Sequence, residues 1–147
     1  MKIRTFIAAA GAAVVLGGTG AFLIPAVASA HSVTHTLKFT AVQQKSANFS
    51  KTASGQAEND LNGTGTIIGF DVIYFVFNPK THTASGDVTF DTNGGFLYGT
   101  LKFTKNPVTH GTVTGGTGIF TGATGTITGK SLNTSGTRTA VTITYTT

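Results

Sequence analysis

The sequence predicts an all-β protein, a single eight-stranded antiparallel barrel, and three observations support this prediction. Short segments of alternating apolar and polar residues recur from residue 34 to the end of the chain. Turn signals rich in Gly, Asn and Pro separate these segments, and no apolar stripe at helical spacing follows residue 31. About eight strands fit into residues 31–147, and closing them into a barrel removes the edges that threonine-rich strands would expose to aggregation.

The first thirty residues are predicted to be a signal peptide. Lys2 and Arg4 form a short basic region, an uncharged apolar run follows from Phe6, and residues 28–30, Ala-Ser-Ala, provide a cleavage signal. We therefore expect a secreted, extracellular protein whose mature domain is residues 31–147. An uncleaved anchor is the alternative, because about two dozen uncharged residues are long enough to cross a bilayer. Glycines and a proline inside the run weaken that alternative, so no stable membrane insertion is expected after cleavage.

The composition excludes several classes of function. The chain has no cysteine, which rules out disulfide scaffolds, cysteine-based zinc sites and thiol catalysis. Without Lys2 and Arg4, the 10 basic residues become 8 against 5 acidic ones, a net charge of only +3 that predicts no nucleic-acid partner. Apart from His31 and His35, the histidines lack metal-ligand spacing, so neither a metal nor a cofactor is expected.

The first half of the mature chain contains two predicted strands and a loop. Residues 34–41 alternate cleanly and are predicted to be a half-buried strand. Residues 43–62 are polar, with Phe49 as their only aromatic residue, and are predicted to be a long loop with at most one short strand, suited to a flexible lid. Residues 64–77 are apolar on both faces, so this strand requires a cover on both sides. Either another subunit or a helix or loop covers the outside, and we expect self-association there.

The second half is predicted to continue the barrel. Residues 78–81 and 93–95 carry turn signals. Residues 115–130 contain six glycines among threonines, which predicts strand, tight corner and strand. The remaining predicted strands are residues 87–91, 96–103, 108–114, 124–130 and 137–145.

Three segments resemble the allene oxide cyclase and dirigent barrel superfamily. The sequence GTIIGFDV at residues 65–72 is similar to an early barrel strand of the cyclases. Residues 106–118, which begin NPV and end GGTG, are similar to a dirigent strand, and IFTGATG at residues 119–125 is similar to both families. The matches lie within residues 63–147 and agree in order and spacing. The resemblance implies an eight-stranded barrel with an apolar cavity, assembled as dimers or trimers, that acts on reactive hydrophobic molecules without a cofactor.

One position departs from the resemblance. Cyclases carry a glutamate, and dirigent proteins an arginine, where this chain has Thr121. Threonine neither carries a charge nor readily exchanges a proton at neutral pH, so neither family's mechanism transfers whole.

Asp71 is the candidate catalytic residue. It occupies the position of a cavity-facing cysteine in the cyclases, and apolar residues surround it in the sequence. A buried aspartate has a raised pKa unless a partner compensates, and it can serve as general acid, general base or anchor for a ligand hydroxyl. The alternative is a structural aspartate held by backbone N–H groups or by Arg138. Tyr74 is expected on the opposite face of the strand, and Tyr98 at the rim or an interface.

Two functions remain open at this point. In the first, the barrel binds a small hydrophobic molecule and steers its cyclisation or isomerisation, because confinement in one conformer supplies much of such catalysis. In the second, the barrel is filled by its own side chains and the protein is a non-catalytic structural or interaction protein. The predicted ligand-binding residues are the inward-facing aromatics: Phe39, Phe75, Phe90, Phe103 and Tyr145.

Overall fold

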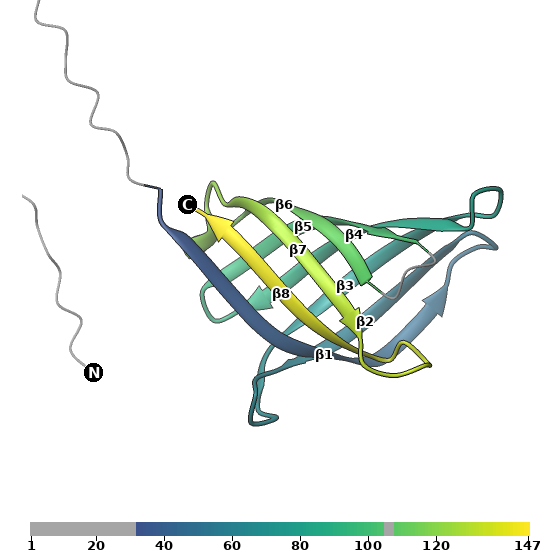
Figure 1. Cartoon of the computed structure of the whole chain (residues 1–147), viewed down its shortest axis with the longest axis horizontal. Coiled ribbons are helices and arrows are strands. Elements are labelled where there is room, and N and C mark those ends of the chain that lie inside the picture. The colour runs from purple at the N-terminus through teal and green to yellow at the C-terminus, as the bar shows by residue number, and fades with distance from the viewer. Residues whose placement is uncertain (1–31, 105–107) are drawn as a thin grey trace, which may run out of the picture. The chain divides into compact units, whose positions relative to one another are not determined.

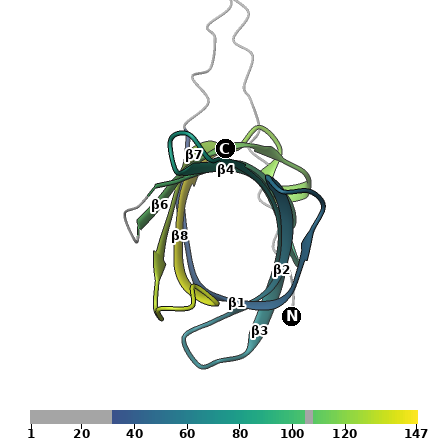
Figure 2. The same ribbon diagram turned by 90° about the vertical axis from the view of Figure 1, so that its right-hand side faces the viewer.

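The computed structural model describes residues 32–104 and 108–147, which form one closed antiparallel barrel of eight strands (Figure 1). Each strand pairs with the next along the chain, and β8 (Arg138–Thr146) pairs with β1 (Thr34–Asn48), which closes the ring (Figure 2). The predicted fold class is confirmed. The predicted signal peptide and the Asn106-Pro107 turn lie outside the described residues. In the described part of the chain, no helix has the length and apolar character needed to span a membrane.

The remaining elements follow the sequence pattern closely. The predicted strands from residue 64 onward, with the turns at residues 78–81 and 93–95, are all present within a few residues of their expected bounds. They are β3 (Ile67–Asn78), β4 (Thr83–Thr92), β5 (Gly95–Phe103), β6 (Val108–Gly116) and β7 (Thr124–Ser131), together with a short 3-10 helix, η1 (Gly118–Phe120).

The prediction of a long loop at residues 43–62 is wrong. β1 continues to Asn48, and β2 (Ala53–Leu61) fills most of the remainder, so no lid is formed there. β2 pairs with both β1 and β3 along its whole length. Its sequence reads as a loop because it turns polar side chains toward the barrel interior, against the usual pattern in which the inward face is apolar. In the sequence, a strand whose polar residues are buried therefore looks the same as a solvent-exposed loop.

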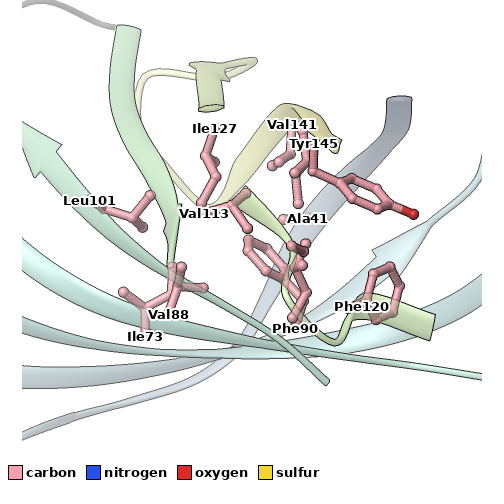
Figure 3. Packing of buried hydrophobic residues seen from close by; sticks show 13 residues of the cluster. Ala41, Ile73, Val88, Phe90, Leu101, Val113, Phe120, Ile127, Val141 and Tyr145 are labelled. Atoms are coloured by element: carbon pink, nitrogen blue, oxygen red, sulfur yellow. The ribbon is translucent and has the colours of Figure 1, made fainter. Parts of the chain in front are cut away.

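The core lies inside the barrel and is built mainly by β4 to β8. Along these strands the apolar core residues point inward, and on β7 and β8 the outward residues are mostly threonines, in keeping with the period of two. Leu97 and Ile143 are fully buried, and Val113 is nearly so. Figure 3 shows this cluster, with Leu101 and Ile73 toward one end and Phe120 and Tyr145 toward the other.

The glycine-rich segment forms the corner between β6 and β7. Instead of a plain tight turn, it contains η1, whose Ile119 N–H donates to the Gly94 carbonyl oxygen at 3.0 Å. Gly118 has a φ of +60°, and a Cβ added there would collide with the same carbonyl oxygen. Thr117 accepts a hydrogen bond from the Phe96 N–H at 3.0 Å. This corner is therefore fixed against the β4–β5 hairpin and covers one end of the barrel.

The outer face of β3 is apolar, as the sequence predicts. The outer face of β3 consists of Phe70, Val72, Tyr74 and Val76, which point away from the interior and are 44 to 49% exposed. The ring of Phe49 lies against Tyr74, with 6.0 Å between the ring centroids. The expected separation of Tyr74 from Asp71 is confirmed, since Asp71 points inward.

Candidate functional site

Two cavities lie inside the barrel, one toward each end. The η1 cavity, about 250 Å³, lies beside the 3-10 helix and includes Phe39, Asp60, Phe90, Phe120 and Tyr145 in its walls. The Gly136 cavity, about 110 Å³, lies toward the β7–β8 loop and includes Glu58, Asp71, Phe75, Phe103 and Thr139 in its walls. Phe90 lines both cavities. The interior is thus neither one large pocket nor solidly filled.

Three carboxyl groups stand between these cavities. Asp71 on β3 pairs in register with Glu58 on β2, and Asp60 lies two residues further along β2. Residues opposite or diagonal to each other on one face of a sheet are close enough to interact. Only 1% of Asp71, 3% of Asp60 and 5% of Glu58 is exposed. The inward period of two on β2 and β3 therefore gathers three acids inside the barrel.

The partners of these carboxyls are few. The Gln56 side-chain amide donates to the Glu58 carboxylate, and a hydrogen bond joins Asp60 and Asp71. Asp60 Oδ1 and Asp71 Oδ1 are buried and have no hydrogen-bond partner within residues 32–104 and 108–147. Gly69 pairs with Asp60 in register, and a Cβ added at Gly69 would collide with the Asp91 carbonyl oxygen and lie 3.5 Å from Asp60 Oδ2. Unsatisfied buried oxygens are rare in proteins and often mark a site for a ligand or water.

Burial raises the pKa of all three groups. Desolvation is the largest cause for Asp71, whose pKa rises from 3.8 to about 9, and the charges of Glu58 and Asp60 add to it. The pKa of Asp60 rises from 3.8 to about 7, again chiefly through desolvation, while its hydrogen bond with Asp71 opposes the rise. Desolvation also raises the pKa of Glu58. At neutral pH, Asp71 is therefore protonated, and its hydroxyl donates a hydrogen bond to the Asp60 carboxylate when Asp60 is ionised.

The Asp60–Asp71 pair combines acid and base in one hydrogen-bonded unit. Two adjacent carboxyls that share one proton titrate in separate steps, which is how such pairs supply or accept a proton near neutral pH. Asp60 presents this unit to the larger cavity, whereas Asp71 faces the smaller one. A molecule in the η1 cavity would thus touch Asp60, with Asp71 behind it as the proton reservoir.

Comparison with solved structures identifies the architecture. A pyocyanin demethylase superposes with a TM-score of 0.61 at 16% sequence identity, over 76% of this chain and 99% of the other. A pterocarpan synthase dirigent protein superposes with a TM-score of 0.60 at 13% identity, over 87% of this chain and 96% of the other. The fold is a dirigent-like barrel. No protein-family model and no curated protein matches the sequence.

Within this dirigent-like barrel, the predicted site residues are placed as follows. Asp71 is buried in the interior, and its alternative partner Arg138 is exposed at the start of β8. The electrostatic influences on Asp71 come from Asp60 and Glu58, so a structural ion pair with Arg138 is not the explanation of its burial. Thr121 is exposed at the end of η1, where its hydroxyl donates to the Gly118 carbonyl oxygen at 2.9 Å.

The five predicted aromatic residues all face the interior but separate into two groups. Phe75 and Phe103 contact each other at a centroid distance of 4.9 Å and line the Gly136 cavity. Phe39 and Phe90 meet edge to face at 5.7 Å, and both line the η1 cavity together with Tyr145. Tyr98 lies outside the barrel, as predicted, and is 38% exposed.

Sequence reasoning missed Glu58 and Asp60. Both lie in the segment that was predicted to be a loop, where acidic residues usually mean solvation. The available signal was the spacing of Gln56, Glu58 and Asp60, three polar residues at a period of two. This spacing places all three on one face of a strand, and the neighbouring strand then decides whether that face is buried.

Proposed function

We propose that this protein binds a small hydrophobic molecule in the η1 cavity and steers its cyclisation or isomerisation without a cofactor. The observation that carries the proposal is the pair of buried carboxyls, Asp60 and Asp71, which line the two cavities and each have a buried oxygen with no hydrogen-bond partner among the described residues. Burying three acids in a barrel core opposes folding. A role for them in contacting a ligand accounts for their presence.

The walls of the η1 cavity favour a hydrophobic ligand. Apart from Asp60 and a short polar stretch at the β4–β5 turn, the walls consist of aliphatic and aromatic side chains. A cavity of about 150 Å³ accommodates benzene, so the volume of about 250 Å³ admits an aromatic molecule larger than a single ring. Ile119 lies at this cavity and is 66% exposed, which places the cavity next to the protein surface.

The proposed cyclisation or isomerisation depends on confinement of the ligand and on a proton from the Asp60–Asp71 pair. Holding a flexible molecule in one reactive conformer lowers the entropic barrier to ring closure or double-bond migration. The Asp60–Asp71 pair then provides a proton at one atom of the ligand and recovers it from another, which leaves the ligand isomerised and the pair unchanged. Asp71 remains the proposed catalytic acid, acting through Asp60, which touches the ligand.

A second candidate function is a non-catalytic structural or interaction protein. The contacts Phe39–Phe90 and Phe75–Phe103 favour it, because these pairs fill much of the middle of the barrel. In either case we propose export to the extracellular space. We also propose self-association through the outer face of β3, as dimers or trimers, since that face has no charged residue among its four side chains.

The binding proposal is tested with N-phenyl-1-naphthylamine, a neutral dye whose fluorescence rises in apolar sites. Leu37 lines the η1 cavity, and its neighbour Lys38 points outward on the same strand. Leu37→Trp fills the cavity and is expected to weaken dye binding at least about tenfold, whereas Lys38→Trp leaves it unchanged. Equal binding by both variants and the wild type, or no binding by any of them, would contradict the proposal.

A further inference from the structure

The interior of the barrel has an imbalance of charge. The chain has five acidic residues, and three of them, Glu58, Asp60 and Asp71, are inside the barrel. No lysine, arginine or histidine lines either cavity in the described part of the chain. The electrostatic influences on the three acids come only from one another and from Gln56. A carboxyl that ionises in this interior therefore has no cation from the protein to balance its charge.

Aromatic rings line the same cavity as Asp60. Phe39 and Phe90 meet edge to face on one part of the wall, and Phe120 meets Tyr145 at a centroid distance of 5.4 Å on another. Figure 3 shows Phe120 and Tyr145 at the same end of the buried cluster. Aromatic faces attract cations through the ring quadrupole, and rings gathered around a cavity are a known receptor for ammonium groups.

We propose that the η1 cavity is a receptor for a small organic cation, an ammonium group that carries apolar substituents. This proposal deepens the proposed function, on which it rests, by naming the charge of the ligand. Asp60 would contact the cation with its carboxylate, and the rings of Phe39, Phe90 and Tyr145 would surround the apolar substituents. A charge-assisted contact in a dry cavity is stronger than the same contact in water.

The geometry favours an organic cation over a metal ion. Among the described residues, no three His, Cys, Asp or Glu side chains are arranged to hold a metal. The walls of the η1 cavity contribute one carboxylate, whereas hard metal ions require six or more oxygen ligands. An alkylammonium group requires only one carboxylate, because its methyl groups prefer the apolar walls.

Protons compete with such a cation. Asp60 must be ionised to attract it, and the pKa of Asp60 near 7 means that lowering the pH below neutrality removes the charge. The other titratable groups that face this region are Glu58 and Asp71 beside Asp60, Tyr145 across the cavity, and His35, which stacks on Tyr145 at 5.2 Å. We therefore expect cation affinity to rise from pH 5 to pH 8, with net release of a proton on binding in the middle of that range.

The test compares two molecules of the same shape. Benzyltrimethylammonium and neopentylbenzene differ in one atom, a charged nitrogen in place of a neutral carbon. Each is titrated into the mature barrel at pH 8 in competition with N-phenyl-1-naphthylamine. We expect the cation to bind at least about tenfold more tightly than the hydrocarbon. Asp60→Asn should abolish this difference and leave hydrocarbon binding unchanged, and Asp60→Glu should restore it.

The matched control is Asp87→Asn, which removes an equal charge from the outside of β4 and should leave the preference unchanged. Circular dichroism confirms that each variant is folded. Equal affinity of the wild type for the two molecules, or a preference that survives in Asp60→Asn, would overturn the cation proposal while leaving hydrophobic binding intact. Failure of both molecules to bind would overturn the proposed function as well.

Discussion

The β2–β3 and β7–β8 pairs of strands belong to the same barrel but have opposite polarity. β7 and β8 place Ile127, Val141 and Ile143 inside, and their outward residues are mostly threonines. β2 and β3 instead place three carboxyls inside and the four apolar side chains of the outer face of β3 in solvent. The arrangement in β7 and β8, with apolar residues inside and polar residues outside, favours folding of a barrel. The arrangement in β2 and β3 opposes folding on both faces.

This difference teaches where stability and function lie in the molecule. Apolar burial on β4 to β8 provides the hydrophobic driving force, at roughly 25 cal/mol per Å² of buried apolar surface. Buried carboxyls and exposed apolar strands both reduce stability, and departures from the favourable pattern concentrate at functional sites. We therefore assign ligand contact to the inner face of β2–β3 and self-association to its outer face. The β7–β8 pair contributes mainly to the stability of the fold.

The largest predicted effect is a difference in the loss of unfolding free energy between a variant in β8 and a variant in β3. Ile143→Ala removes a fully buried side chain from β8 and should lower the unfolding free energy by about 2 to 5 kcal/mol. Val72→Ala on the outer face of β3 should change it by no more than about 0.5 kcal/mol in the monomer. Urea unfolding at low protein concentration measures both. Similar losses in the two variants would remove the distinction between the regions.

The second prediction concerns pH, because only the β2–β3 side contains buried acids. When unfolded, Asp60 and Asp71 lose their protons near pH 3.8, whereas in the barrel they hold them to about pH 7 and about pH 9. Between these values the folded state binds more protons than the unfolded state, so raising the pH lowers stability. The unfolding free energy should fall by up to about 1.4 kcal/mol per pH unit for each proton involved.

The variants that check this slope are matched pairs of Asp→Asn changes. Replacing both Asp60 and Asp71 should flatten the decline between pH 5 and pH 9. Replacing Asp87 and Asp91, on the outside of β4, should leave the decline in place. A wild-type protein whose stability rises over this range would show that the buried carboxyls are ionised in the native state.

The smallest predicted effect concerns assembly and leaves the barrel itself unchanged. Val72→Lys introduces a charge into the outer face of β3, and burying that charge between subunits would be costly. We expect light scattering at micromolar concentration to show an oligomer for the wild type and a monomer for Val72→Lys. Thr126→Lys, on the outside of β7, should assemble like the wild type. A wild-type monomer would contradict self-association directly.

The same comparison explains how much the sequence predicts. Conventional strands such as β7 and β8 are recognised from their alternation, and the doubly apolar pattern of residues 67–77 correctly indicates that the outer face of β3 is apolar. The predicted cover on that face stays a prediction. β2 was not recognised, because polar residues that face a cavity and polar residues that face water have the same composition. Asp71 was found because apolar neighbours flank it and because it matches a cavity-facing position in the cyclases that the sequence resembles. Its partners Glu58 and Asp60 lie on a different strand, and only the pairing of β2 with β3 brings them together.

The most direct test of this account is a ¹³C NMR titration of the side-chain carboxyl carbons of Asp60 and Asp71 in the mature barrel. The structure predicts that Asp71 remains protonated at pH 7 and titrates near pH 9, while Asp60 titrates near pH 7. Because the pair is hydrogen bonded, both signals should report both steps. Titration of both carboxyls near pH 4, as in solvent-exposed aspartates, would contradict the existence of a proton-holding acid pair inside the barrel.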